Sequence, residues 1–221
     1  PIESLFDLTK DPMEFNDLAG DPNMKEELER LRAVHHQWMK KILDIGLIPE
    51  GIMRNWEEKN DQSIYKWIRT QEDFYDELLV ISSTANENLL FEGLNHTNEA
   101  LRYWAGQGLY NLDKKIKKAT VERLNQKLYD SISNVRISAA RALLKHEPPS
   151  KELMMVLSNG LKAENEWTRL QTALVLDDFQ NALKVLEKQS QNLIHSDTNK
   201  YVVRVLNHGL NVLNGSSNKV K

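Results

Sequence analysis

The sequence has no cysteine, no long apolar run and little net charge. The absence of cysteine excludes disulfides and thiolate metal ligands, but it does not decide the compartment. The longest run of apolar residues is Leu153–Leu157, which is too short to cross a bilayer as a helix. With 29 Lys and Arg against 32 Asp and Glu, the chain lacks the basic excess that is typical of nucleic-acid binding.

What remains is a chain of 221 residues, of which 40% are apolar, enough for one or two packed domains. It begins with Pro1 rather than Met and carries no recognisable signal peptide. We therefore expect it to be a piece of a longer protein, with any targeting segment lost upstream. The polar end, residues 214–221, is expected to be a disordered tail.

The strongest regularity is a repeated segment that is centred on an arginine. It occupies residues 98–109, 132–143 and 165–176, and it returns more faintly at 200–210. The central arginines recur every 33 to 35 residues: Arg102, Arg136, Arg169 and Arg204. Self-similarity at this period indicates stacked two-helix units, because no single unit buries its apolar face alone.

Small residues follow each of the first three arginines at the third and fourth positions. These pairs are Ala105-Gly106, Ala139-Ala140 and Thr172-Ala173. Small side chains at one level let neighbouring helices approach closely, and the arginines themselves are expected to bond between repeats as structural ladders. The fourth copy has Asn207 and His208 instead, as expected of a terminal cap or of a chance match.

The region before the repeats predicts a short strand and then a long helix. Loose alternation over Glu3–Leu8 favours a strand, which ends in a turn at Lys10-Asp11-Pro12. This strand has no partner in a chain that is otherwise helical, so we expect its sheet in missing sequence or in a partner. Residues 47–61 are predicted as a loop with at most one turn of helix, and residues 64–68 and 73–82 as helices.

The long helix is predicted from Asp21-Pro22 to Gly46, with Asp21 as the N-cap and Pro22 at the first helical position. Apolar residues recur along it at steps of three and four. They are Met24, Leu28, Leu31, Val34, Trp38, Ile42 and Ile45.

Residues 4–22 read Ser-Leu-Phe-Asp-Leu-Thr-Lys-Asp-Pro-Met-Glu-Phe-Asn-Asp-Leu-Ala-Gly-Asp-Pro. They resemble the C-terminal segment of type I sulfatases, which commonly close with Leu-Tyr-Asp-Leu, a Lys-Asp-Pro turn, Asn-x-Leu-Ala and a long helix. Phe6 stands where the family usually has Tyr. The repeats resemble HEAT repeats, with Val135-Arg136 followed by Ala139 and Ala140, and this order is similar to a bacterial sulfatase subgroup that carries such repeats after the enzyme.

The resemblance implies a mainly α fold, namely an α-α solenoid of HEAT-like repeats preceded by a short strand and a long helix from a sulfatase C-terminal subdomain. The expected divisions are 1–50 for the sulfatase C-terminal segment, 51–76 for a connecting region, 77–213 for the repeats and 214–221 for the tail. The implied parent is a periplasmic or secreted bacterial sulfuric ester hydrolase that acts on sulfated carbohydrate, with calcium and formylglycine in its catalytic domain.

The catalytic Cys/Ser-x-Pro-x-Arg motif of that family is absent from this sequence. We therefore assign no catalytic, cofactor-binding or metal residue to this segment, and whether it is part of an enzyme stays open. The expected partners are the catalytic domain of the same parent chain and a sulfated glycan or a protein on the repeat surface, with no nucleic acid and no membrane span. The alternative is a stand-alone HEAT-repeat scaffold that binds another protein.

Several clusters have both a functional and a plainer interpretation. Asp7, Asp11, Glu14, Asp17 and Asp21 match no compact calcium loop, and we interpret them as turn and cap residues. His35 and His36 are adjacent and diverge on a helix, so they do not face one metal. Lys114–Lys118 is interpreted as a solvated helix start with Ile116 inward, an anionic polymer being the alternative. Trp104 and Trp167 are interpreted as packing residues, and stacking on sugars is the alternative.

Overall fold

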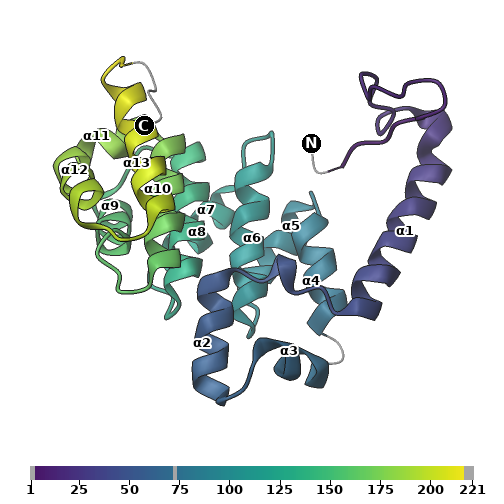
Figure 1. Ribbon diagram of the computed structural model, residues 1–221, viewed down its shortest axis with the longest axis horizontal. Helices are drawn as coiled ribbons and strands as arrows, with labels where there is room; N and C mark the ends of the chain where they lie inside the picture. The colour runs from purple at the N-terminus through teal and green to yellow at the C-terminus, as the bar shows by residue number, and fades with distance from the viewer. Residues whose placement is uncertain (1–2, 72–73, 217–221) are drawn as a thin grey trace.

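The computed structural model describes residues 3–71 and 74–216, and within these ranges the chain is mainly helical and contains no strand (Figure 1). None of the described helices is long and apolar enough to span a membrane. The region before the repeats forms α1 (Lys25–Ile42), α2 (Glu50–Asn60), α3 (Ile64–Trp67) and α4 (Phe74–Ser83). Three 3-10 turns lie beside these helices at Pro22–Met24, Ile45–Leu47 and Ile68–Thr70.

The repeated segments are the second helices of consecutive helix pairs. The pairs are α5 (Glu87–Gly93) with α6 (Glu99–Asn111), α7 (Lys118–Lys127) with α8 (Ser133–His146), α9 (Lys151–Gly160) with α10 (Glu166–Asp178), and α12 (Glu187–Ser196) with α13 (Lys200–Leu213). An additional short helix, α11 (Gln180–Val185), precedes the last pair. The faint fourth copy is therefore also the second helix of a pair, and Val202, Leu206 and Leu210 of this helix, α13, are buried.

The second helices pack against one another in order, α6 on α8, α8 on α10 and α10 on α13 (Figure 1). Gly106 of α6 lies so close to α8 that a Cβ atom there would overlap Ser138 Oγ. Ala105, Ala139 and Ala140 are all fully buried at this level. The prediction that small residues permit close helix approach is confirmed.

The predicted loop at residues 47–61 is wrong, because most of it forms α2. Ile48, Ile52 and Trp56 are spaced four residues apart and are buried in a core with residues of α3, α4 and α6. The Trp56 indole donates to Glu99 of α6, and the Trp104 indole donates to the Leu47 carbonyl. Burial of this apolar face outweighs the polar stretch and the Pro49 and Gly51 signals that favour a loop.

The predicted strand at Glu3–Leu8 is also not formed. The Leu5 amide donates to Asp17 Oδ1 at 2.9 Å, and the Leu18 amide donates to the Leu5 carbonyl at 2.7 Å. The described chain offers no partner strand, so the Asp17 carboxylate and the Leu18 amide satisfy the Leu5 backbone in place of a strand ladder. The Arg32 guanidinium forms an ion pair with Glu3, which folds the segment back onto α1.

The long helix is confirmed, but it ends at Ile42 rather than at Gly46. Leu43 adopts a left-handed conformation with φ 53°, and its amide and that of Asp44 return to the carbonyls of Lys40 and Met39. This is the usual left-handed helix stop, occupied here by Leu instead of Gly, which explains why the sequence did not reveal it. At the other end of the chain, residues 217–221 of the predicted tail lie outside the described residues.

Substituting Ala140 by Leu is expected to destabilise the protein by about 1 to 3 kcal/mol, because three added carbons have no space between α8 and its neighbours. The matched control is Ala33→Leu, since Ala33 lies exposed on α1 and its substitution is expected to change stability by less than about 0.5 kcal/mol. Urea unfolding followed by circular dichroism measures both. Equal effects of the two changes would show that the close helix contact is misplaced.

Candidate interaction surfaces

The N-terminal part of the chain stands apart from the stacked helices. We call residues 3–42, which comprise the folded-back segment and α1, the arm. Figure 1 shows α1 touching the body at its C-terminal end, where Met39 packs with Tyr75 and Leu79. The Tyr75 hydroxyl donates to the Asp44 carbonyl at 2.6 Å, and Lys40 forms an ion pair with Asp76. These contacts anchor one end of the arm and leave most of α1 in solvent.

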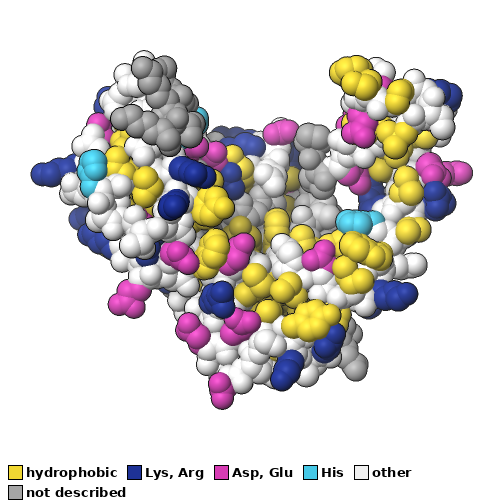
Figure 2. Space-filling view, in the orientation of Figure 1, with side chains coloured by type: hydrophobic (Ala, Val, Ile, Leu, Met, Phe, Trp, Pro, Cys, Tyr) yellow, Lys and Arg dark blue, Asp and Glu magenta, His cyan; other side chains and the backbone are white. Residues whose placement is uncertain are grey.

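The apolar stripe predicted on the long helix is present but is not buried. Leu31, Val34, Trp38 and Ile42 remain 39 to 53% exposed along one face of α1. Leu8, Met13 and Phe15 of the preceding segment are exposed as well. Figure 2 shows patches of hydrophobic surface on the arm, with charged and polar side chains between them. Exposed hydrophobic patches of this kind mark interaction sites on protein surfaces.

The acidic residues of the arm act in turns, as the sequence predicted. Asp11 accepts the Asn16 amide, Asp17 accepts the amides of Leu5 and Ala19, and Asp21 caps the turn before α1. The Thr9 hydroxyl and the Lys10 ammonium bond to Asp7 and lower the pKa of Asp7 to about 2. The carboxylates of Asp7, Asp11, Asp17 and Asp21 thus bond to backbone amides of the arm.

His35 and His36 do not converge on a metal. Their ring centroids are 6.3 Å apart and tilted, and the His35 ring stacks instead on Trp38. Within residues 3–71 and 74–216, no group of three or more His, Asp and Glu side chains is arranged to hold a metal ion.

Two repeat arginines bond across the junction to the next helix pair. Arg102 makes a two-pronged ion pair with Asp130 at 2.8 and 3.0 Å, and Arg169 makes the same pair with Asp197 at 2.6 and 2.9 Å. Each acid lies 28 residues after its arginine. Both arginines also donate to two carbonyls in the turn of their own pair. The predicted ladder is confirmed at these two junctions.

The middle junction differs. Arg136 donates to the carbonyls of Asp130 and Ser131 and to the Ser133 hydroxyl. The residue 28 positions later is Glu164, and the described structure has no ion pair between them. Asn134 and Gln171 exchange hydrogen bonds between α8 and α10 instead. The sequence could not anticipate this change of bonding.

Polar side chains on the second helices α6, α8 and α10 form hydrogen bonds with one another. Arg141 bonds to Gln107 of α6 and Asp178 of α10, and it stacks 4.0 Å from the centre of the Tyr110 ring. At the other end of this face α2 approaches so closely that a Cβ atom on Gly51 would lie 2.7 Å from Asn134 Oδ1. These contacts hold the helices together.

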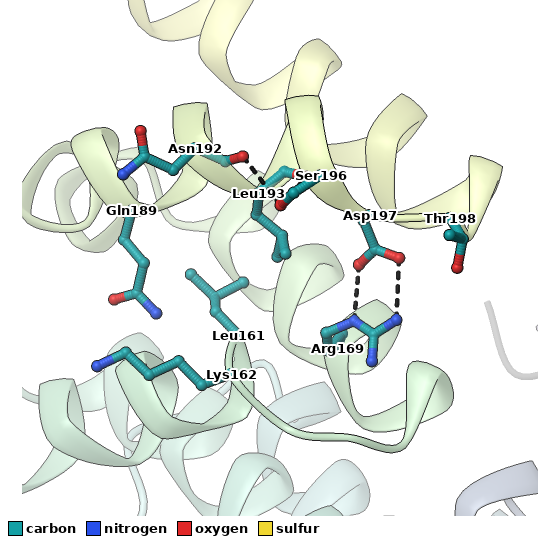
Figure 3. A pocket seen from close by; sticks show the side chains of 9 residues that line it. All are labelled: Leu161, Lys162, Arg169, Gln189, Asn192, Leu193, Ser196, Asp197 and Thr198. Carbon is teal, nitrogen blue, oxygen red and sulfur yellow. Dashed lines mark hydrogen bonds and ion pairs between the residues drawn. The ribbon is translucent and has the colours of Figure 1, made fainter.

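The remaining candidate sites are the two tryptophans of the repeats and a surface groove. Trp104 packs as predicted, with its indole bonded to Leu47, and Trp167 is half-buried. A groove of about 390 Å³ lies between α12 and the turn after α9, and Figure 3 shows the Arg169–Asp197 pair at its wall. Gln189 in this groove already exchanges hydrogen bonds with Ser158. Gln189, Arg169 and Asp197 in the wall of this groove are therefore already bonded within the protein.

Comparison with known proteins relates part of the chain to a sulfatase. A stretch of 66 residues, 29% of this chain, is 35% identical to an ulvan-active sulfatase from Formosa agariphila. The matched stretch covers 11% of that enzyme, so the chain spans only a small share of the curated relative it matches. No family model matches the chain, and no solved structure matches it.

Replacing Asp197 by Ala is expected to destabilise the protein by about 3 kcal/mol, because it leaves the nearly buried Arg169 without its counter-charge. The pKa of Asp197 is lowered chiefly by the hydrogen bonds from Arg169. The control is Glu164→Ala at the equivalent position of the middle junction, for which less than about 0.5 kcal/mol is expected. Urea unfolding measures both, and similar losses would contradict the assigned ladder.

The turn at residues 7–10 is expected to stay folded at pH 4 and to loosen as the pH falls towards 2. A carboxyl whose pKa is lowered on folding favours the folded state above its ordinary pKa of 3.8 and loses that contribution as the pH falls through about 2. Carbon-13 NMR titration of Asp7 measures this midpoint. Thr9→Ala should raise it towards 3.8, whereas Thr70→Ala, whose hydroxyl bonds to a carbonyl, should leave it unchanged. An Asp7 midpoint near 3.8 in the unaltered chain would contradict the hydrogen bonding.

Proposed function

We propose that this chain is the C-terminal, non-catalytic part of a sulfatase, a sulfuric ester hydrolase that acts on sulfated carbohydrate. The observation that carries the proposal is the coincidence of two properties in the arm. Its sequence resembles the end of sulfatases, and its apolar face is exposed along most of α1. The partial identity to the Formosa sulfatase supports the same assignment.

In this proposal the arm packs on the catalytic domain of the same parent chain. Covering Leu31, Val34, Trp38 and Ile42 removes apolar surface from water, which is the main driving force for association. The segment Glu3–Leu8 then gains the partner strands that the described chain does not offer. Because only one end of α1 is anchored to the body, the stripe stays accessible along its length.

The helix pairs serve as an accessory interaction module of HEAT-like repeats arranged as an α-solenoid. The parent enzyme, periplasmic or secreted, supplies the calcium and the formylglycine of the reaction. The sequence of this segment has no cysteine and no Ser-x-Pro-x-Arg, so no residue here is given a catalytic role.

A stand-alone protein-binding scaffold is the competing function. Such scaffolds bind partners on an extended inner surface. Here α2 lies against part of that surface, and the Arg141 network bonds much of the remainder internally. We therefore favour the sulfatase assignment, which also accounts for the arm.

The experiment that tests this assignment is to read the coding sequence upstream of the Pro1 codon. The expected result is an open frame of several hundred codons that contains Cys/Ser-x-Pro-x-Arg. A start codon immediately ahead of Pro1 would contradict the proposal, and the arm would then require a separate partner.

Trp38→Gln is expected to change the stability of the isolated chain by less than about 0.5 kcal/mol, because the side chain is 53% exposed there. In the longer enzyme the same change should lower the melting temperature by several degrees, since it removes apolar area from an interface. Tyr129→Gln, at an exposed aromatic residue outside the arm, is the control for both proteins. Equal melting temperatures of the Trp38 variant and the unaltered enzyme would argue against docking of the arm.

A further inference from the structure

The lysine cluster at residues 114–118 is divided by the fold into two pairs that face different surroundings. Lys114 lies 3.4 Å from the carboxylate of the buried Glu87, and Lys117 donates its backbone amide to Glu87 and its ammonium to Asn88. Ile116 is buried, as predicted. Lys115 and Lys118 instead line a groove of about 580 Å³. The first pair is structural, and the second pair is available to a ligand.

This groove lies between the start of α7 and the connection from α8 to α9. Of its apolar side chains, Val121 and Pro148 are accessible, whereas Ile116, Leu143 and Leu153 are almost fully buried. Its polar side chains are Lys115, Lys118, Glu122, Asn125, Glu147 and Ser150. A volume of this size accommodates a small organic ligand, and apolar walls with a few polar groups are typical of such sites.

The polar groups retain bonding capacity. Within the described residues Lys115 makes no ion pair, and the contact of Lys118 with Glu122 is 3.8 Å between two strongly exposed side chains, so it is weak. Asn125 gives an amide hydrogen to the Val121 carbonyl and keeps its oxygen as an acceptor. Ser150 accepts the Leu153 amide and keeps its hydroxyl hydrogen to donate.

We propose that this groove binds a sulfated saccharide. The two ammonium groups bond the sulfate oxygens, and Glu122, Glu147, Asn125 and Ser150 bond sugar hydroxyls. The accessible apolar surface of Val121 and Pro148 meets the carbon face of a ring. Two carboxylates beside two lysines disfavour a uniformly charged polyanion such as a nucleic acid. The choice of sulfate as the anion rests on the proposed function. The description of the groove and of its lysines is independent of that function.

The test uses the full chain and a κ-carrageenan tetrasaccharide, its desulfated form and sodium sulfate as probes. Nitrogen-15 NMR shifts are expected at residues around Lys115, Asn125 and Ser150 on addition of the sulfated tetrasaccharide. Desulfation should weaken binding at least tenfold, and Lys115→Gln with Lys118→Gln should have the same effect, since each change removes the hydrogen bonds between ammonium and sulfate. Lys184→Gln with Lys200→Gln, two exposed lysines on α11 and α13, is the control and should leave binding unchanged.

Three results would overturn the proposal. The first is that the tetrasaccharide does not bind at concentrations up to about 10 mM. The second is that it binds but the Lys115 and Lys118 substitutions do not weaken the binding. The third is that sodium sulfate binds as tightly as the tetrasaccharide. Thermal unfolding of both double variants verifies that they are folded. Reading the upstream coding sequence is independent of this titration, so failure of the groove and failure of the sulfatase assignment are distinguishable.

Discussion

The close contact between α6 and α8 is the constraint on which the rest of the helix stack depends. Gly106 and Ser138 leave no space for a larger side chain, and the buried alanines beside them keep the two axes near each other. The arginine ladders then link consecutive pairs through their turns, with Arg102 on Asp130 and Arg169 on Asp197. Small residues set the distance between helices, and buried ion pairs fix their register.

The N-terminal region is joined to this stack by packing rather than by a flexible linker. Ile52 and Trp56 of α2 share a core with Ala100 and Leu101 of α6, and indole hydrogen bonds lock the same contact. The end of α1 is held in turn by Tyr75 of α4. Any partner that covers the arm is thereby placed at a defined position relative to the repeats.

Much of this arrangement was predictable from the sequence, and the failures share one cause. Periodicity and small residues indicated the helix pairs, and Asn98, Asn165 and Asn199 cap their second helices as their side chains favour. The helix α2 and the unformed strand were missed because tertiary contacts, or their absence, decide them. The helix end at Leu43 was missed because Leu occupies a left-handed position that usually belongs to Gly. Of the candidate surfaces, the apolar stripe on α1 was predicted from the sequence. Its exposure, and the division of the lysine cluster into a bonded pair and an available pair, depend on tertiary contacts that the sequence pattern does not show.

We propose above all that the apolar face of the arm packs against a sulfatase domain. Hydrogen exchange of the α1 amides measures this most directly, because an uncovered helix opens more readily than one held in an interface. We expect fast exchange over residues 28–38 in the isolated chain and slow exchange in the longer enzyme, with the α6 and α8 amides slow in both. Equal exchange of α1 in the two proteins would contradict it.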